Sequence, residues 1–464
     1  MSATVAHSGK GMKLHNKILL GLVVGAILGI LANWLLGSEH VAVELTNRYL
    51  AGPVGQIFLN LLFMIVMPLV FASIALGVTG LGDVRRLGSV GGKTLLYFLI
   101  TTALAATLGI LIVLAVRPGS RIAPETRAEL LETFAEGAQQ RIATSEQQEF
   151  GINTLVNIVT RNPLASAVDM DMLGVIFFGI MFGVALTLIR EERAKPMIGF
   201  LQALQDIVIK IVEIAMKLAP YGVAGLIFGV TSRFGFELLL PLGRYVAVVL
   251  VALLLHAVVT LSLIVRFLGG LSPLVFYSRI KAALVTAFST SSSAATLPTN
   301  IAVAEQNLGV PNKIAGFVLP LGNTMCMNGT SLFEGITIIF LAQVFGITFS
   351  VPQMIVVMSM AVITAVGAAG VPGGSIPLLV GILAMFGVPG EGIALILGVD
   401  RILDMSRTVV NVLGDLTATV VIGRSEGAWS PAMLPAESTL STGGLDDSPG
   451  WPAPSPAAPK VEGA

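Results

Sequence analysis

The sequence has little charge and almost no cysteine. Only 12% of its 464 residues are Asp, Glu, Lys or Arg, against roughly a quarter in soluble globular proteins. The one cysteine, Cys326, excludes an intramolecular disulfide framework and a thiolate metal cluster. The four histidines share no spacing typical of a metal site. The formal net charge is zero, so charge gives no reason to expect binding to nucleic acid.

Hydrophobic residues make up 55% of the chain and gather in long uncharged runs. A helix needs about 20 consecutive apolar residues to cross a bilayer. Runs of about this length occur at residues 18–36, 54–81, 94–116 and 173–189, and further spans are expected at 197–234 and 245–265. The basic start of the first run resembles a signal peptide, but the many later spans favour a retained first helix. The sequence therefore predicts an all-α polytopic membrane protein.

Basic residues bias short loops toward the cytoplasm, and this predicts the orientation of the chain. Lys10, Lys13 and Lys17 precede the first span and place the N-terminal segment 1–15 inside. Counting spans from there puts residues 117–171 outside, as an extracellular loop. Residues 426–464 are rich in Pro, Ser, Ala and Gly, so they are expected to form a disordered cytoplasmic tail. We expect a multi-pass protein of the inner or plasma membrane with both termini in the cytoplasm.

Two uncharged stretches near the C-terminus contain residues that interrupt a helix. The first interruption reads STSSSAATLP at 289–298, and the second reads GAAGVPGGS at 367–375. Non-helical backbone at membrane depth persists only where protein or water satisfies its polar groups, so each interruption predicts a hairpin tip. Each hairpin lies beside a helix with polar residues, and the two units have opposite expected orientations. Such inverted repeats are typical of transporters that bind substrate near the bilayer midplane.

The last predicted helix concentrates its polar residues on one face. At 3.6 residues per turn, an arc of about 100° contains Asp400, Asp404, Arg407, Thr408, Asn411 and Asp415. Intramembrane charges normally face a bundle interior or a cavity, which makes them candidates for function. The alternative is a structural network in which Asp404 pairs with Arg407. That alternative does not explain the other polar residues on the same face.

The side chains on this face suit an acidic amino acid and a cation. The guanidinium of Arg407 offers a planar fork for a carboxylate, and the carboxylate of Asp404 can accept from an ammonium group. Asp415 together with backbone carbonyls can hold a hard cation in oxygen ligands. Serine hydroxyls and N–H groups, where a helix restarts after the first tip, suit a second carboxylate.

Four motifs occur in this order along the chain: SSSAATLP, MNGT, GVPGG and DMSRTVVNVLGD. With these motifs, residues 15–425 resemble the dicarboxylate/amino acid:cation symporter family, which includes glutamate transporter homologues. The resemblance implies eight transmembrane helices, two re-entrant helical hairpins, and a homotrimer whose transport domain moves like an elevator against a scaffold. It divides the chain into scaffold helices 1–2 at 16–93, transport-domain helix 3 at 94–116, scaffold helices 4–5 with transport-domain helix 6 at 172–270, hairpins at 271–311 and 351–389, and helices 7 and 8 at 312–345 and 390–425.

The resemblance also implies site residues, position by position. The implied substrate contacts are Ser291, Ser293, Thr330, Val371, Gly373, Asp404, Arg407, Thr408 and Asn411. The implied sodium ligands are the Asp415 side chain with the carbonyls of Gly322, Cys326 and Asn411, and, at a second site, mostly backbone oxygens around Thr324, Met327, Ala365, Val366 and Ala368. Family members that carry C4-dicarboxylates usually have no acidic residue at the position of Asp404. Its presence favours an amino acid.

A third cation site of the family departs from the usual pattern in this chain. The family usually reads NMDGT where this chain reads CMNGT, so Cys326 and Asn328 replace an amide and an anionic ligand. Thr101 and Thr102 can still supply hydroxyls, but Phe98 stands where a tyrosine is usual. Losing these ligands weakens a site for a hard cation, so no sodium is predicted there.

Glu334 adds a candidate proton carrier. It lies one turn beyond Thr330, and in proton-coupled eukaryotic relatives a glutamate at the matching position carries a proton. A carboxyl in apolar surroundings takes up a proton readily. The alternative is an ion pair between Glu334 and a basic residue such as Arg401. We expect coupling to fewer sodium ions than is usual for the family, with a proton as a further coupling ion.

The predicted function is uptake of aspartate or glutamate with sodium, protons or both, and without an organic cofactor. A C4-dicarboxylate or a neutral amino acid symporter remains open. An intramembrane hydrolase would need a base beside the serines of the first tip, where no histidine is placed, and a channel would need a continuous polar lining. The chain is therefore not expected to be an enzyme, and its expected partners are a small anionic substrate, membrane lipid and further copies of itself.

Overall fold

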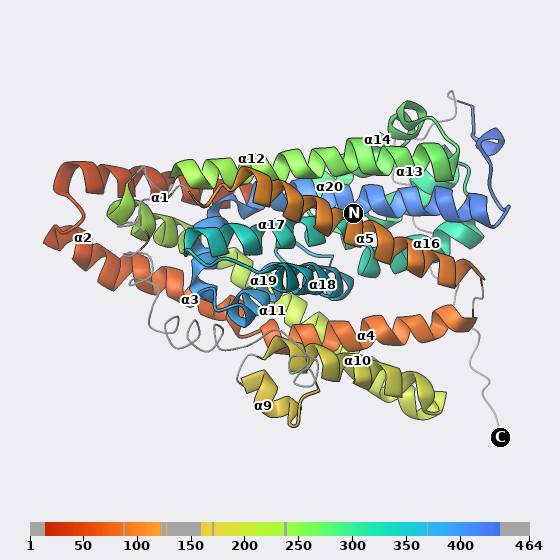
Figure 1. Ribbon diagram of the computed structural model, residues 1–464, viewed down its shortest axis with the longest axis horizontal. Helices are drawn as coiled ribbons and strands as arrows, with labels where there is room; N and C mark the ends of the chain where they lie inside the picture. Colours follow the sequence, from red (N-terminus) through yellow and green to blue (C-terminus); the bar gives the residue numbers. More distant parts are fainter. Residues whose placement is uncertain are drawn as a thin grey trace, which may run out of the picture.

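The computed structural model describes residues 14–86, 89–120, 122, 127, 159–168, 171–235, 239–368 and 370–436, and all regular secondary structure within these ranges is helical (Figure 1). Seven helical segments of the described chain are long and apolar enough to cross a membrane. They are Asn16–Leu36, Val41–Thr79, Ser89–Val116, Glu191–Phe234, Leu239–Gly269, Asn312–Val344 and Ala394–Ser425. The predicted span at 173–189 is the helix α10 (Met172–Leu188), which is apolar but has only 17 residues.

One group of helices packs around α11 (Glu191–Phe234). Its members are α1 (Leu14–Leu36), α2 (Val41–Thr46), η1 (Asn47–Ala51), α3 (Gly52–Phe63), α4 (Val66–Arg86), α9 (Pro163–Val168) and α10. The axes of α1 and α11 approach closely because α1 presents small residues: a Cβ added to Gly25 would lie 2.9 Å from the Cα of Ala224. Lipid-facing apolar residues are expected on such peripheral helices, and only 17% of the α1 span is buried.

The second group contains most of the buried polar side chains among the described residues. It consists of α5 (Ser89–Val116), α12 (Leu239–Leu255) with η2 (His256–Leu261), α13 (Ser262–Ile264) and η3 (Val265–Gly269), α14 (Pro273–Thr290), α15 (Ser293–Ala302), η4 (Val303–Asn307), α16 (Asn312–Met325), α17 (Asn328–Val344), α18 (Val351–Gly367), α19 (Ile376–Met385), η5 (Gly390–Ile393) and α20 (Ala394–Ser425). The α16–α17 span is wholly buried and the α20 span is 83% buried, so other helices shield them from lipid.

Both predicted interruptions occur in the structure. Helix α14 ends at Thr290 and α15 begins at Ser293, inside the segment 289–298. Helix α18 ends at Gly367 and α19 begins at Ile376, around the segment 367–375. We refer to residues 291–292 as tip 1 and to residues 370–375 as tip 2. The helices therefore break at both positions that the sequence predicts, while the re-entrant placement of the two hairpins stays a prediction.

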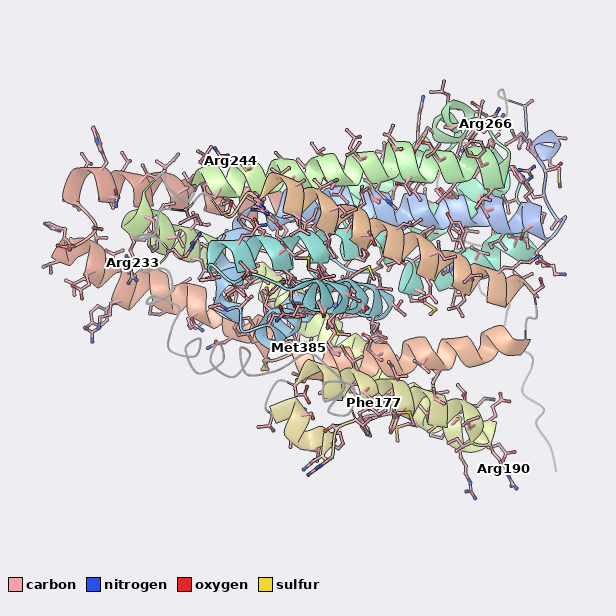
Figure 2. All side chains as sticks on the ribbon, in the orientation of Figure 1. Phe177, Arg190, Arg233, Arg244, Arg266 and Met385 are labelled. Atoms are coloured by element: carbon pink, nitrogen blue, oxygen red, sulfur yellow. The ribbon has the colours of Figure 1, made fainter. Side chains whose placement is uncertain are left out.

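Four arginines mark the two ends of the long axis of the bundle (Figure 2). Arg190 and Arg266 lie toward one end, while Arg233 and Arg244 lie toward the other. The ends of the fourth and sixth predicted spans therefore lie toward the same end of the bundle. Which side is cytoplasmic stays a prediction.

The expectation of disorder from residue 426 onward is wrong for residues 426–436. The indole N–H of Trp429 donates to the carbonyl of Leu308 at 2.7 Å, and this side chain is buried. Arg279 of α14 donates to the carbonyl of Pro435 at 2.8 Å. Glu426 accepts from Lys93 at 2.6 Å, and this hydrogen bond lowers the pKa of its carboxyl. Composition suggested disorder, but one tryptophan and these contacts anchor the segment. Residues 437–464, like 1–13 and most of 117–171, lie outside the described chain.

Candidate substrate and cation site

Tip 1 turns the chain within two residues and starts α15. Ser291 adopts a left-handed conformation, with φ of 51°, and ends α14 as its C-cap. Ser292 is extended and caps α15, because its hydroxyl accepts from the N–H of Ala295 at 3.1 Å. This turn directs Ser291 and Ser293 toward the same small cavity.

Tip 2 contacts both tip 1 and α20. The carbonyl of Gly370 accepts from the Ser292 hydroxyl at 2.7 Å and from the N–H of Ala294 at 3.1 Å. At the other end of tip 2, the N–H of Gly373 donates to Oδ2 of Asp404 at 3.2 Å. Gly373 has a φ of +74°, which favours glycine at this position. Hydrogen bonds thus join the two tips to one another and join tip 2 to α20.

The helix at 312–344 is unwound at Cys326 and Met327, between α16 and α17. Asn411 of α20 satisfies the freed backbone: its Oδ1 accepts from the N–H groups of Gly329 at 2.7 Å and Thr330 at 3.3 Å. Its Nδ2 donates to the hydroxyl of Thr330 at 3.1 Å. A Cβ on Gly329 would lie 2.9 Å from the backbone of α20, so glycine allows this close approach.

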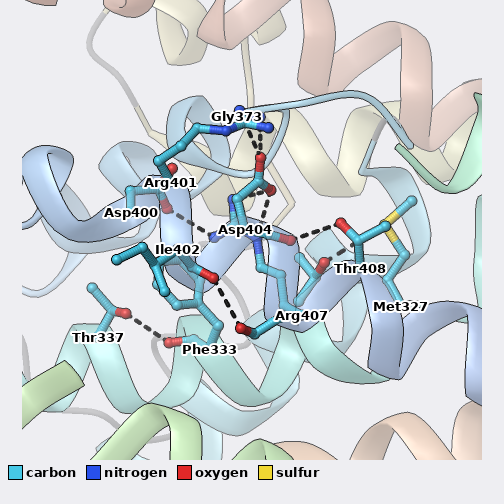
Figure 3. A network of polar contacts seen from close by, with 12 residues as sticks. Met327, Phe333, Thr337, Gly373, Asp400, Arg401, Ile402, Asp404, Arg407 and Thr408 are labelled. Carbon is cyan, nitrogen blue, oxygen red and sulfur yellow. Dashed lines mark hydrogen bonds and ion pairs between the residues drawn. The ribbon is translucent and has the colours of Figure 1, made fainter. Parts of the chain in front are cut away.

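Four charged side chains of α20 form a buried network (Figure 3). Arg407 donates from Nε at 3.0 Å and from Nη2 at 2.7 Å to Oδ1 of Asp404, and from Nη1 to Asp400 at 3.0 Å. Arg401 pairs with Oδ2 of Asp404 at 3.1 Å. The Arg407 guanidinium also stacks over the ring of Phe333, with 4.3 Å between Cζ and the ring centroid. Two arginines and two aspartates give this network no net charge.

The cavity between the tips and α20 has a volume of about 20 Å³. All of the predicted substrate residues except Gly373 line it, and Gly373 reaches it through Asp404. Such a volume holds about one water molecule, so an amino acid enters only if the tips separate. In this conformation Arg407 and Asp404 bind each other, as the structural alternative predicts. They lie at the cavity wall, as the functional hypothesis requires.

Asp415 fits a cation ligand. It is 1% exposed, and its Oδ1 has no hydrogen-bond partner in the described part of the chain. A buried carboxylate oxygen without a partner is costly, and a cation would satisfy it. A Cβ on Gly322 would lie 2.5 Å from this oxygen, so glycine is needed beside it. Cys326 lies at the unwound turn, and its N–H donates to the carbonyl of Gly322 at 2.8 Å.

The second predicted set of cation ligands lies where α16 and α18 end. Helix α16 ends at Met325, one residue after Thr324, and α18 ends at Gly367, beside Val366 and Ala368. Helix C-termini leave carbonyl groups without intrahelical partners, and such oxygens suit sodium. The carbonyl of Ala365 accepts weakly from the N–H of Ala368 at 3.4 Å. Thr324, Val366 and Ala368 from these two helix ends line one cavity.

At the third predicted cation site, the side chains bond to one another. The hydroxyl of Thr102 donates to Oδ1 of Asn328 at 3.0 Å, and the Cys326 thiol lies 3.7 Å from the same oxygen. Thr101 donates to the carbonyl of Tyr97 at 3.0 Å, beside the buried ring of Phe98. The amide oxygen that could hold a cation is therefore already engaged. This geometry favours the expectation that sodium does not bind there.

Glu334 is buried and separate from the ion network. One carboxylate oxygen accepts from the hydroxyl of Thr364 at 2.7 Å, and the other has no hydrogen-bond partner among the described residues. The suggested ion pair with Arg401 is not formed, because Arg401 points to Asp404 instead. Glu334 is thus a buried carboxyl that forms no ion pair within the described part of the chain.

A larger cavity of about 640 Å³ lies on the other side of tip 2. It is bounded by α4 and α11 of the first group and by the ends of α16 and α18 of the second. Ala368, Gly370 and Val371 line both this cavity and the small one. Tip 2 is therefore the wall between the candidate substrate site and the larger cavity.

Several site residues escaped the sequence interpretation. Arg401 lies about 100° from Asp400 around the helix, at the margin of the polar face, and was considered only as a partner for Glu334. Phe333 and Ser375 are apolar or small residues in apolar segments. Charge balance could have pointed to Arg401, because two buried aspartates beside Arg407 require a second positive side chain.

The arrangement defines a class of protein. A buried, charge-balanced network beneath two helical tips, inside a bundle of apolar helices, is the architecture of a polytopic membrane transporter. The profile of the Sodium:dicarboxylate symporter family matches residues 14–425. The chain therefore belongs to this family, as its motifs predict.

Named relatives are transporters rather than enzymes. The chain is 36% identical over 416 residues to the proton/sodium-glutamate symport protein of Geobacillus stearothermophilus, covering 89% of this chain and 94% of the relative. It is 35% identical over 410 residues to the proton/glutamate-aspartate symporter of Escherichia coli (strain K12), covering 88% and 92%. It is 32% identical over 431 residues to C4-dicarboxylate transport protein 2 of Mesorhizobium japonicum, covering 92% and 94%.

Proposed function

We propose that the protein is a secondary active symporter that moves aspartate or glutamate into the cell together with cations. The observation that supports this most strongly is the Arg407–Asp404 pair in the wall of the cavity beneath both tips. When the tips separate, Arg407 can exchange Asp404 for a substrate carboxylate, and Asp404 can receive the ammonium group. The names of the glutamate and glutamate-aspartate symporting relatives favour the same substrates.

The remaining predicted contacts complete the proposed substrate site. Ser291, Ser293 and the start of α15 offer hydroxyl and N–H donors to the second carboxylate. Thr330, Thr408 and Asn411 supply polar groups from the facing helices. Val371 and Gly373 belong to tip 2 and close over the ligand.

The number of coupled sodium ions follows from the charges of the site and of the substrate. The α20 network is neutral without a ligand, since two arginines balance two aspartates. A sodium ion at Asp415 neutralises that carboxylate, and a sodium ion at the ends of α16 and α18 balances the single negative charge of an acidic amino acid. We propose no sodium ion at Thr102 and Asn328, because their side chains bond to each other. The coupling therefore uses fewer sodium ions than is usual for the family.

Glu334 supplies the proposed proton coupling. Its unpartnered carboxylate oxygen and apolar surroundings favour the protonated form, so a proton would travel with the site. The relatives named as proton or proton/sodium symporters agree with this assignment. The proposal places the proton and the substrate on the same face of α17, one turn apart.

The proposed movement is that of an elevator. The group around α11 corresponds to the scaffold, and the group of α5, α12 and the hairpins corresponds to the transport domain, with tip 2 as the gate. The large cavity where the two groups meet supports this division. We further propose that the hairpin-plus-helix units α14–α17 and α18–α20 are inverted repeats, that the protein forms a homotrimer, and that both termini are cytoplasmic.

The test is uptake of radiolabelled L-aspartate by purified protein in liposomes, under an inward sodium gradient, an inward proton gradient, both, or neither. We expect accumulation with either gradient and the most with both. Transport of succinate or a neutral amino acid without any aspartate uptake would reject the assignment of Arg407 and Asp404. Flux that is not saturable, and that continues without solute, would indicate a channel instead.

A further inference from the structure

A second arginine, Arg401, lies beside the candidate substrate site and is assigned no substrate contact in the proposed function. Its side chain is buried, with 8% of its surface exposed. Its Nη1 lies 3.1 Å from Oδ2 of Asp404, while Arg407 occupies Oδ1 of the same carboxylate (Figure 3). Asp404 therefore has a guanidinium on each of its oxygens.

The two arginines differ in whether they must release Asp404 when substrate binds. Arg407 lines the cavity and has to release Asp404 when it takes a substrate carboxylate. Arg401 contacts the other oxygen, together with the N–H of Gly373 at 3.2 Å from tip 2. Arg401 can therefore keep its contact with Asp404 while Arg407 exchanges partners.

This difference decides which substrates the site can hold. A buried carboxylate requires a positive partner, and removal of that partner from a buried pair is strongly unfavourable. An amino acid brings its own partner for Asp404 in its ammonium group. A four-carbon dicarboxylate brings none, so with Arg407 engaged by the ligand only Arg401 can balance Asp404.

We propose that Arg401 is a specificity-determining residue: by balancing Asp404 independently of the ligand, it allows the site to accept a C4-dicarboxylate as well as an acidic amino acid. The inference rests on the proposed function of the same site. With Arg401 in place, a site that contains Asp404 can also accept succinate. Without Arg401, the network would hold two carboxylates and one guanidinium, and a substrate dianion would meet a net negative charge.

The experiment compares inhibition of labelled L-aspartate uptake by unlabelled succinate and by unlabelled L-aspartate in proteoliposomes. We expect succinate to compete in the unmodified protein. In Arg401→Met, the inhibition constant of succinate should rise about tenfold relative to that of aspartate, because a lost buried charge partner costs at least that factor. Arg401→Lys retains the charge and should keep the ratio within about twofold of the unmodified protein. Arg424→Met, which removes an arginine at the end of the same helix, is the matched control and should leave the ratio unchanged.

Three results would overturn the inference. The first is an unmodified protein that transports aspartate and is not inhibited by excess succinate. The second is an Arg401→Met variant whose ratio is unchanged while both affinities fall, which indicates a purely structural role. The third is a ratio that shifts toward succinate. If Arg401→Met does not reach the membrane, Arg401→Gln takes its place, and the first result remains decisive by itself. Absence of aspartate uptake in the unmodified protein rejects the proposed function instead.

Discussion

Glu334→Gln tests the origin of proton coupling most directly. Glutamine has nearly the shape of a protonated glutamate, so its amide oxygen can still accept from Thr364, which now donates at 2.7 Å. Its NH₂ group takes the place of the second carboxylate oxygen, which has no partner among the described residues. The substitution therefore preserves packing and removes only the ability to gain and lose a proton.

The expected magnitude follows from thermodynamics. If one proton moves with each substrate, an inward gradient of one pH unit contributes about 1.4 kcal/mol and raises the steady-state accumulation ratio about tenfold. In Glu334→Gln the proton gradient should contribute nothing, while the sodium gradient keeps its effect. The assay is steady-state L-aspartate accumulation in liposomes, measured against the pH gradient with the membrane potential held at zero.

The control is Glu305→Gln, the same chemical change on a partly exposed carboxylate that accepts from Asn312. It should keep the full response to the pH gradient. A tenfold response that persists in Glu334→Gln would refute the reasoning, because the coupled proton would then reside elsewhere. Equal loss of sodium-driven and proton-driven accumulation would show that the substitution damages the site rather than its coupling.

Three further changes test the site and its packing. Asp415→Asn removes the carboxylate of the first cation site, and we expect the sodium concentration for half-maximal uptake to rise at least about tenfold, as measured by sodium titration. Ser292→Ala removes the hydroxyl that donates to Gly370 and caps α15, so weaker closure of the tips by about 1 kcal/mol should raise KM for aspartate about fivefold. Unchanged KM would show that these hydrogen bonds do not limit binding. Gly329→Ala pushes a methyl group against the backbone of α20 and should lower Tm by several degrees, about 1–3 kcal/mol of strain, whereas Gly92→Ala, which meets no atom within 4 Å, should not.

Much of the fold could be predicted from composition and pattern. Long uncharged runs predict spanning helices because lipid offers no partner for charges or for free backbone groups. The same reasoning predicts the two tips, since Ser- and Gly-rich interruptions cannot face lipid. The short helices α2 and α9 were not predicted, because each is a helix of only 6 residues. The fold of residues 426–436 was missed because one tryptophan outweighs the polar composition around it.

The sequence by itself identified most of the candidate site residues. The helical period places Asp400, Asp404, Arg407 and Asp415 on one face of α20, and the serine and glycine motifs mark the tips that meet it. Only the tertiary structure decided which of these groups bind one another. Periodicity gives the angle of a side chain around its own helix, but the partner depends on distances between helices and on rotamers. Asp404 therefore has two guanidinium partners, whereas Glu334 has no guanidinium partner among the described residues. Asn411 bonds to the unwound turn between α16 and α17.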